Sequence, residues 1–267
     1  MCKSYGRFMV EKRVKAEILQ RLKNTEEKEG VRILMAIESG SRAWGFASPN
    51  SDYDVRFIYA RERDWYLAVD LEDRRDVIEY PIVDEIDLNG WDVRKALKLF
   101  WKSNPAFVEW IQSPMTYITC GNFRDQSLKL LPSIYSVEKG IYHYRSMARS
   151  NYRSYLREES VPLKKYFYAL RPLLAIQWLE QYGSAPPIEF HKVLTLVKDN
   201  QLLDTIHALL ETKRASREKA LAPAIPVLNE FIESELDRLE GISLPRSSRK
   251  IEMDRLNELF HSVLSES

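Results

Sequence analysis

Two short apolar runs, separated by a stretch rich in turn-forming residues, dominate the pattern in the first part of the chain. The first run covers residues 31–37 and gives way to Gly40 and Ser41. The second covers residues 53–60 and follows Ser48-Pro49-Asn50-Ser51, a tetrapeptide typical of loops. Apolar runs of this length, bounded by turn signals, predict buried strands. We therefore expect two strands joined by a short helix that begins at Ser41 and by a return loop.

The sequence up to about residue 120 adds further strands and amphipathic helices. Residues 8–29 place apolar side chains at helical spacing between charges, which predicts a helix that covers one face of a sheet. Asn89 suits a helix cap and Asp92 the first turn, so we expect a helix to begin at Asn89. Further strands are expected at 76–80 and 83–88, a helical turn at 64–69, and a helix at 105–111.

From about residue 125 the pattern becomes almost wholly helical. Pro172 lies inside one of these helices and is expected to kink it. The helices are expected at 136–158, 162–181, 188–199, 201–214, 226–240 and 248–264. The change of pattern predicts two domains, residues 1–120 and residues 121–267. The fold class is α/β (α+β), with a small mixed sheet and flanking helices followed by an all-helical domain.

Acidic side chains open the second strand. Alternate residues of a strand share a face, so Asp52, Asp54 and Arg56 should point one way while the apolar residues between them face the core. Two carboxylates about 7 Å apart on one strand repel each other unless a positive charge lies between them. Mg²⁺ accepts one or two carboxylates and completes its shell with water and substrate phosphates. We expect a metal ion at this position.

Gly40 and Ser41 have the chemistry of a phosphate-binding turn. Glycine lets the backbone approach a triphosphate closely, and the Ser41 hydroxyl and the amides of a helix start can donate to anionic oxygens. Paired aspartates that hold two metal ions can stabilise the attacking and leaving oxygens of an in-line displacement. The combination indicates phosphoryl or nucleotidyl transfer. An isolated D-x-D is more often a solvated strand edge, so the spacing to Gly40 carries the argument.

Composition and charge narrow the classes of partner. The 267 residues are 45% hydrophobic and 30% charged, which is ordinary for a soluble globular protein. A net charge of +1 gives no global attraction to nucleic acid, so any basic surface must be local. Two cysteines are too few for a disulfide framework, and no Cys and His cluster has zinc spacing. Without a signal peptide or a membrane-spanning segment in the sequence, we expect a cytoplasmic protein.

These residues resemble a known family. A Gly-Ser pair, a spacer of ten residues and D-x-D in an apolar strand form the pattern of nucleotidyltransferases of the DNA polymerase β superfamily. The chain is most similar to the bacterial subfamily of an RNA repair pathway associated with RNA ligases, over roughly residues 31–195. The strings that carry this resemblance are GSRAWGF, SDYDVRF, LNGWDVRKALKL, NP..VEWI.SP..Y and KKYFYALRPLLA.

The resemblance implies a third metal-binding carboxylate on a later strand. Asp87, between two apolar residues, is the best match, and Glu85 is the fallback because it shares that face of the expected strand. Arg56 either contacts the triphosphate or neutralises Asp54. Arg42 either contacts phosphate or the acceptor, or is a solvated helix residue.

The helical domain offers basic residues at helical spacing. In related folds this domain closes over the nucleotide, so Lys164 and Arg171 are candidate triphosphate ligands. Arg145, Arg149, Arg153 and Arg157 recur every fourth residue among tyrosines, which suits a nucleic-acid surface. A solvated basic stripe balanced by Glu158 and Glu159 explains the same pattern equally well. The sequence leaves both interpretations open.

The function expected from the resemblance is transfer of a nucleoside monophosphate from an NTP to an acceptor hydroxyl, with release of pyrophosphate. Two Mg²⁺ (or Mn²⁺) ions would be held by Asp52, Asp54 and Asp87, and Asp87 would help deprotonate the acceptor. The expected acceptor is an RNA 3′ end. Proteins and small molecules remain alternatives, as do a D-x-D glycosyltransferase and a non-catalytic regulator that binds nucleotide or RNA, because a fold does not settle its substrate.

Overall fold

The structure, a computed structural model, describes residues 10–215, 221–242 and 253–266. Of these, residues 10–43, 52–134 and 253–266 form a first unit, and residues 44–51, 135–215 and 221–242 form a second. This division differs from the expected boundary at residue 120. Periodicity along the chain marks helices but does not show which unit they pack against, so residues 44–51, residues 121–134 and the last helix lie in the other unit from the one expected.

A five-stranded mixed sheet forms the centre of the first unit. Its strand order is β3-β4-β2-β1-β5, and β2 and β4 run parallel while the other neighbours are antiparallel. The mixed sheet was predicted, but its last strand was not. The strands are β1 Arg32–Glu38, β2 Tyr53–Ala60, β3 Val77–Glu79, β4 Ile86–Asp92 and β5 Thr116–Thr119.

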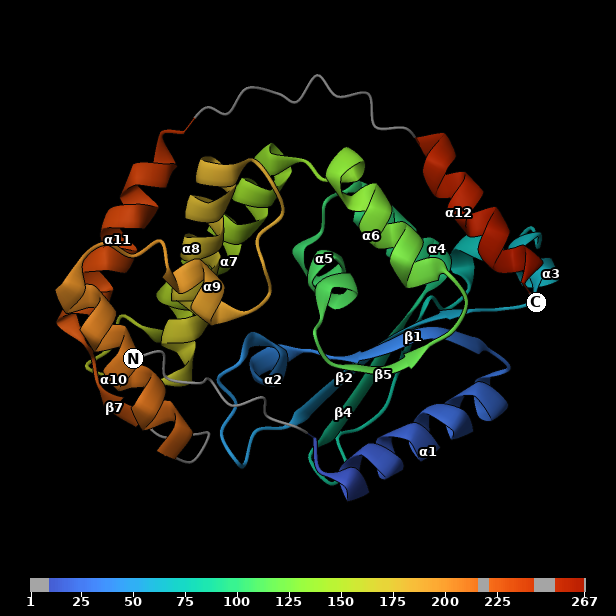
Figure 1. Cartoon of the computed structure of the whole chain (residues 1–267), viewed down its shortest axis with the longest axis horizontal. Coiled ribbons are helices and arrows are strands. Elements are labelled where there is room, and N and C mark those ends of the chain that lie inside the picture. Colours follow the sequence, from blue (N-terminus) through green and yellow to red (C-terminus); the bar gives the residue numbers. More distant parts are fainter. Residues whose placement is uncertain (1–9, 216–220, 243–252, 267) are drawn as a thin grey trace. The chain divides into compact units, whose positions relative to one another are not determined.

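Helices cover both faces of this sheet (Figure 1). One face carries α1 and buries Ile18 and Leu22 against Val55 and Phe57. The other face buries apolar residues of α4, α5, α6 and α12. The helical elements of this part of the chain are α1 Lys12–Glu29, α2 Gly40–Trp44, α3 Arg63–Tyr66, η1 Leu71–Asp73, α4 Val93–Trp101, α5 Pro105–Gln112, α6 Phe123–Ile134 and α12 Met253–Ser265. Residues 8–9 and 248–252, included in two expected helices, lie outside the described residues.

The start of α4 corrects one prediction. Residue 89 lies inside β4, and the strand continues to Asp92, whose side chain accepts a hydrogen bond from the Arg94 backbone N–H and caps the helix. The sequence favours a helix cap at Asn89 because Gly follows Asn there. Parallel pairing with β2 holds this stretch extended, since Arg56 pairs with Asn89 and Phe57 with Gly90. Tertiary pairing therefore overrides the local turn preference.

In its described residues, the second unit is helical except for one two-stranded sheet. Its strands, three residues each, are too short to show an alternation in the sequence, and this sheet was not predicted. The expected helix at 188–199 is reduced to five residues, and Pro172 lies within an α-helix that continues past it. The elements are α7 Val137–Tyr155, β6 Ser160–Pro162, α8 Lys164–Tyr182, α9 Phe190–Leu194, α10 Asn200–Ala215, β7 Leu221–Pro223 and α11 Pro226–Glu240.

Aromatic packing and a buried lysine hold the segment 44–51 in the second unit. The Phe46 ring stacks on Phe167 with centroids 4.5 Å apart. Lys213 of α10 is 3% exposed, and its ammonium donates to the hydroxyl of Ser48 at 3.2 Å and to that of Ser51 at 3.3 Å. The return loop is therefore anchored at its two serines.

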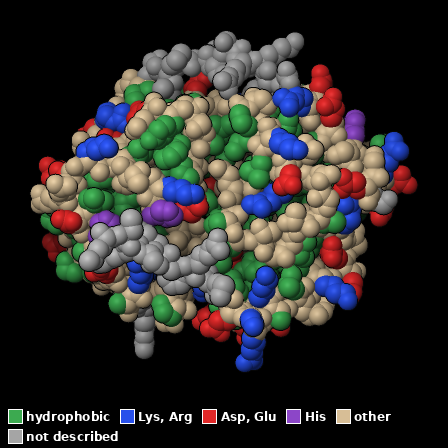
Figure 2. Space-filling view, in the orientation of Figure 1, with side chains coloured by type: hydrophobic (Ala, Val, Ile, Leu, Met, Phe, Trp, Pro, Cys, Tyr) green, Lys and Arg blue, Asp and Glu red, His purple; other side chains and the backbone are tan. Residues whose placement is uncertain are grey.

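Charged side chains of both signs are interspersed on the face shown in Figure 2, in keeping with the net charge of +1. Among the described residues, no helix has the length and apolar character required to cross a membrane.

Gly90 provides a test of the β2–β4 packing. A Cβ atom there would lie 2.2 Å from the ring of Phe57, which is fully buried. We expect Gly90→Ala to lower the free energy of unfolding by about 1–3 kcal/mol, as overpacked cores do, in urea denaturation. Gly241→Ala is the control, because a Cβ there meets nothing within 4 Å. Equal effects of the two substitutions would contradict this account.

Candidate active site

The two carboxylates of Asp54 and Asp87 lie beside each other on neighbouring strands. Asp54 of β2 pairs in register with Asp87 of β4. Arg56 joins them, because its Nη2 lies 3.1 Å from Asp54 Oδ1 and 2.7 Å from Asp87 Oδ2. Its Nη1 also donates to the backbone carbonyls of Asp87 at 2.9 Å and Val55 at 3.1 Å. The three side chains form one ionic cluster at the start of β4.

The position of Arg56 matches the neutralising role that the sequence left open. Both carboxylate oxygens lie within about 3 Å of the same nitrogen, so they are at most ~6 Å apart. Two unit charges at that separation repel by about 3 kcal/mol at an effective dielectric constant of ~20, and the guanidinium offsets this repulsion. Contact of Arg56 with a triphosphate stays a prediction.

Gly40 brings the backbone against Asp54. The Ser39 N–H donates to the Asp54 carbonyl at 2.8 Å, which ties the turn after β1 to the start of β2. Gly40 follows with φ of +58°, a left-handed conformation that favours glycine. A Cβ atom at residue 40 would lie 1.9 Å from Asp54 Oδ2, so the carboxylate fills the space that any other residue would occupy. Ser41 follows, half-buried, in α2.

Arg42 and Asp52 define the two ends of the loop beside this cluster. The Arg42 guanidinium stacks on the Tyr53 ring at 3.9 Å and its Nε donates to the Asp52 carbonyl at 3.3 Å. With 9% of its surface exposed, Arg42 is not the solvated helix residue that the sequence also allowed. Its predicted phosphate contact stays a prediction.

The three carboxylates of Asp52, Asp54 and Asp87 were expected to meet at one metal site, and only part of this arrangement is present. In the described part of the chain, no three His, Cys, Asp or Glu side chains are grouped as a metal site. β2 begins at Tyr53, so Asp52 precedes the strand and the alternation that should align it with Asp54 does not apply to it. Glu85, the fallback, lies in a turn where both it and Asp84 have positive φ. The oxygen donors of Asp54 and Asp87 nevertheless fit Mg²⁺, which typically takes one or two carboxylates.

Glu38 is a buried acid of this site that sequence reasoning missed. Its side chain is fully buried, accepts a hydrogen bond from the Asp54 N–H at 2.9 Å and accepts another from the Tyr117 hydroxyl. Burial raises the pKa of Glu38 to about 7, although these hydrogen bonds act in the opposite direction. The signal in the sequence was an acid at the end of an otherwise apolar strand. Its proximity to Asp54 depends on the pairing of β1 with β2.

The predicted basic ligands of the helical domain lie in the second unit. Lys164 is half-buried at the start of α8. Arg171 is 2% exposed, donates from its guanidinium to the Ile188 carbonyl at 3.3 Å and lies 4.7 Å from the Trp44 ring. These contacts give Arg171 a packing role within its own unit. Nucleotide binding by Lys164 and Arg171 stays a prediction.

Three side chains of the arginine and tyrosine stripe on α7 contact α11. Arg149 pairs with Glu240 at 2.9 Å, and the Tyr152 hydroxyl donates to Glu233. The Arg145 guanidinium donates to the Leu239 carbonyl at 2.8 Å. The sequence suggested Glu158 and Glu159 as the balancing acids, but periodicity cannot show that α11 packs beside α7. The basic character of this stripe is therefore reduced by its neighbour.

The buried acid predicts a pH effect on stability. The pKa of Glu38 lies above its ordinary value of 4.5, so the folded state binds this proton more tightly and loses stability as pH rises from about 4.5 to about 7. Glu38→Gln removes the ionisation. As pH rises across that window, we expect the free energy of unfolding of the variant to increase relative to that of the wild type by up to about 3 kcal/mol. Urea denaturation at several pH values measures this gain. Glu62→Gln, at an exposed acid, is the control, and parallel curves for Glu38→Gln and wild type would contradict the prediction.

Comparisons with known proteins identify the family of this chain. The family model for RlaP, described as the RNA repair pathway DNA polymerase beta family, matches residues 14–262. A Bacillus subtilis (strain 168) protein named "Uncharacterized protein YcgL" is 43% identical over 255 residues, covering 95% of this chain and 97% of the relative. A nucleotidyltransferase-like protein from Exiguobacterium sibiricum 255-15 aligns with 93% of this chain and 89% of its own, at 11% identity and a TM-score of 0.33, which is too distant to transfer geometry. The chain belongs to the RNA repair pathway DNA polymerase beta family.

Proposed function

We propose that the protein is a metal-dependent nucleotidyltransferase that moves a nucleoside monophosphate from an NTP to an RNA 3′ hydroxyl. The acceptor oxygen forms a bond to the α-phosphorus, the bond from that phosphorus to the β-phosphate bridging oxygen breaks, and pyrophosphate and the hydroxyl proton leave. The observation that carries the proposal is the pairing of Asp54 with Asp87 across parallel strands, with Gly40 packed directly against Asp54. Membership of the family supports the reaction class and RNA as the acceptor.

The residues of the chain act mainly by positioning and by balancing charge. Asp52, Asp54 and Asp87 would hold divalent cations, which neutralise the triphosphate when bound. Gly40 and Ser41 seat the phosphates at the turn beside Asp54, and Asp87 accepts the proton of the acceptor hydroxyl. Arg56 balances the two acids between turnovers, because its guanidinium already contacts both. Such a site accelerates the reaction by holding charge where it develops.

Substitution of the acids tests the reaction. We expect Asp52→Asn and Asp54→Asn to reduce pyrophosphate release from NTP by 100-fold or more, roughly the effect of removing a group that stabilises transition-state charge. Release is measured with Mg²⁺ and each NTP in the presence of single-stranded RNA. Asp84→Asn is the matched control, because Asp84 is 77% exposed in the turn before β4 and pairs with Arg21. Full activity in both Asp52→Asn and Asp54→Asn would remove the carboxylates from the mechanism.

The acceptor is tested in the same assay. Incorporation of label from an α-labelled NTP into RNA, blocked when the 3′ hydroxyl is absent, is the expected result. Label found in protein or in small molecules, with none in RNA, would instead assign the same chemistry to another acceptor.

Substitution of Gly40 produces two effects that a control glycine can separate: a collision with Asp54 and the strain of a left-handed backbone. Gly40 and Gly30 have nearly the same positive φ, +58° and +60°, but only at Gly40 would a Cβ collide with a side chain. Both alanine substitutions should lower the free energy of unfolding by about 1 kcal/mol through the left-handed backbone. We expect Gly40→Ala alone to abolish most pyrophosphate release, because Asp54 must move. Similar activity of the two variants at matched stability would show that the contact with Asp54 has no role.

A further inference from the structure

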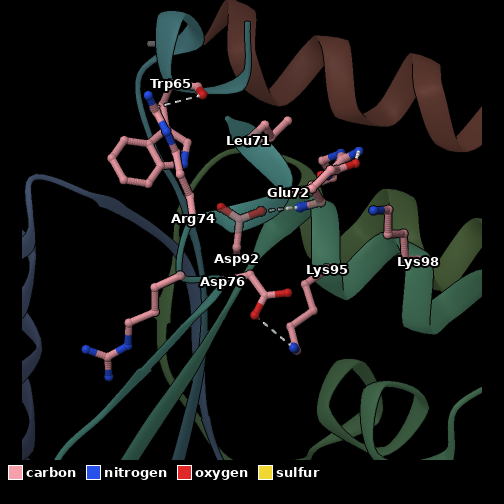
Figure 3. Close-up of a pocket in the computed structure, with 10 residues that line it drawn as sticks. Trp65, Leu71, Glu72, Arg74, Asp76, Asp92, Lys95 and Lys98 are labelled. Atoms are coloured by element: carbon pink, nitrogen blue, oxygen red, sulfur yellow. Dashed lines mark hydrogen bonds and ion pairs between the residues drawn. The ribbon is translucent and has the colours of Figure 1, made fainter. Parts of the chain in front are cut away.

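A second charged site lies at the other end of β4. A cavity of about 240 Å³ opens in the first unit between the segment 65–76 and the start of α4. Figure 3 shows the Asp92 carboxylate in the middle of the lining side chains, with Lys95 and Lys98 on the α4 side and Arg74 against Trp65. The complete lining is Trp65, Leu71, Glu72, Arg74, Arg75, Asp76, Asp92, Arg94, Lys95 and Lys98.

The acids of this cavity already have partners. Glu72 accepts two hydrogen bonds of 2.7 Å from the Arg94 guanidinium. Asp76 pairs with Lys95 at 2.9 Å, as the dashed line in Figure 3 shows. Asp92 accepts from the Tyr66 hydroxyl at 2.7 Å, and burial raises its pKa, which lowers its tendency to carry charge.

Within the described residues, no ion pair neutralises the positive charges of Arg75 and Lys98. Both side chains are exposed, and neither forms an ion pair within the described residues. Lys98 still acts on its surroundings, since its charge helps to lower the pKa of Glu72. Five cationic and three acidic side chains line the cavity, and Asp70 pairs with the lining residue Arg74 from outside it, so the group carries a net charge of +1 when all are ionised. Such a cavity favours an anion.

The size of the cavity restricts the anion. Pockets that hold a whole drug-sized ligand or cofactor span roughly 300–1,000 Å³. The volume of about 240 Å³ lies below that range, so the cavity suits a phosphate group rather than a complete nucleotide. Arg75 and Lys98 are cations of the kind that bind phosphate oxygens.

The cavity and the carboxylate cluster share one strand. Asp87 and Asp92 are five residues apart on β4, which at a rise of ~3.3 Å per residue separates them by roughly 17 Å. Alternation places Asp87 and Trp91 on the same face, and Trp91 packs against the apolar cluster to which α4 contributes. α4 therefore covers the side of the sheet from which Asp87 projects. A phosphate chain bound on this side of the sheet would therefore span a fixed distance between the carboxylate cluster and the cavity.

We propose that this cavity binds a backbone phosphate of the single-stranded RNA acceptor, upstream of the 3′ end that reaches the carboxylates. At an axial rise of ~3.4 Å per nucleotide in a stacked strand, 17 Å along the axis corresponds to about five nucleotides. The proposal rests on the proposed function for its choice of acceptor. Binding at the cavity, however, does not require turnover, so the two are tested separately.

The test measures RNA binding to the inactive Asp54→Asn protein as a function of salt. For single-stranded nucleic acid, the logarithm of the binding constant falls with the logarithm of salt with a slope of about −0.7 for each phosphate neutralised. We expect the additional substitutions Arg75→Ala and Lys98→Ala together to weaken binding and to reduce the magnitude of the slope by about 0.7, the loss of one phosphate contact. Fluorescence anisotropy of a short labelled single-stranded RNA provides the binding constants.

The control removes an exposed cation on the opposite face of the sheet. Lys23 on α1 is 67% exposed, and Lys23→Ala should leave the slope unchanged. Arg75 and Lys98 are exposed, so the double variant should fold, and its melting temperature verifies this. Equal slopes with and without Arg75 and Lys98 would overturn the proposal.

Two further measurements identify the source of the phosphate and separate the proposals. Inorganic phosphate could raise the melting temperature only when Arg75 and Lys98 are present. If their substitution then left the salt slope of RNA binding unchanged, RNA would be overturned as the source of the phosphate. In the otherwise wild-type protein, we expect the double substitution to raise KM for RNA while kcat and KM for NTP stay unchanged. Absence of pyrophosphate release in the wild type would refute the proposed function alone, because the salt slope is measured without turnover.

Discussion

The balance of charge around Arg56 is the interaction on which the candidate site depends. Two acids held in register on parallel strands would repel each other, and the guanidinium between them contacts both. The same guanidinium donates to the backbone carbonyls of Asp87 and Val55, so it ties the two strands together as well as their acids.

The surrounding structure limits how these acids can move. The α1 face of the sheet and the face under α4, α5, α6 and α12 are both buried, so β2 and β4 cannot slip without exposing apolar side chains. Gly40 approaches Asp54 from one side, and Glu38 accepts the Asp54 N–H from the neighbouring strand. Asp54 is thereby held through both its side chain and its backbone. Asp52 precedes the strand, and its backbone carbonyl accepts a hydrogen bond from Arg42.

The basic groups of the first unit complement this acidic centre. Carboxylates repel a phosphate, so a phosphate contact is more favourable at a distance from them. The cavity beside α4 has two cations without ion pairs in the described structure, whereas on α7 Arg149 is paired with Glu240 of α11. The ion pairs that each basic residue forms with its neighbours therefore decide whether it is available to a phosphate. The number of arginines and lysines does not decide this.

The sequence by itself determined the two strands on either side of the Gly40-Ser41 turn, the turn itself, the mixed α+β class and the family, because strand periodicity and residue spacing are local properties of the chain. Asp87 was placed only by resemblance, and its register opposite Asp54 came from the parallel pairing of β2 with β4. The tertiary structure alone decided the burial of Glu38 and Arg171, the extension of β4 through Asn89, and the return of α12 to the first unit. Each of these depends on contacts between residues far apart in the sequence, which a local pattern does not encode.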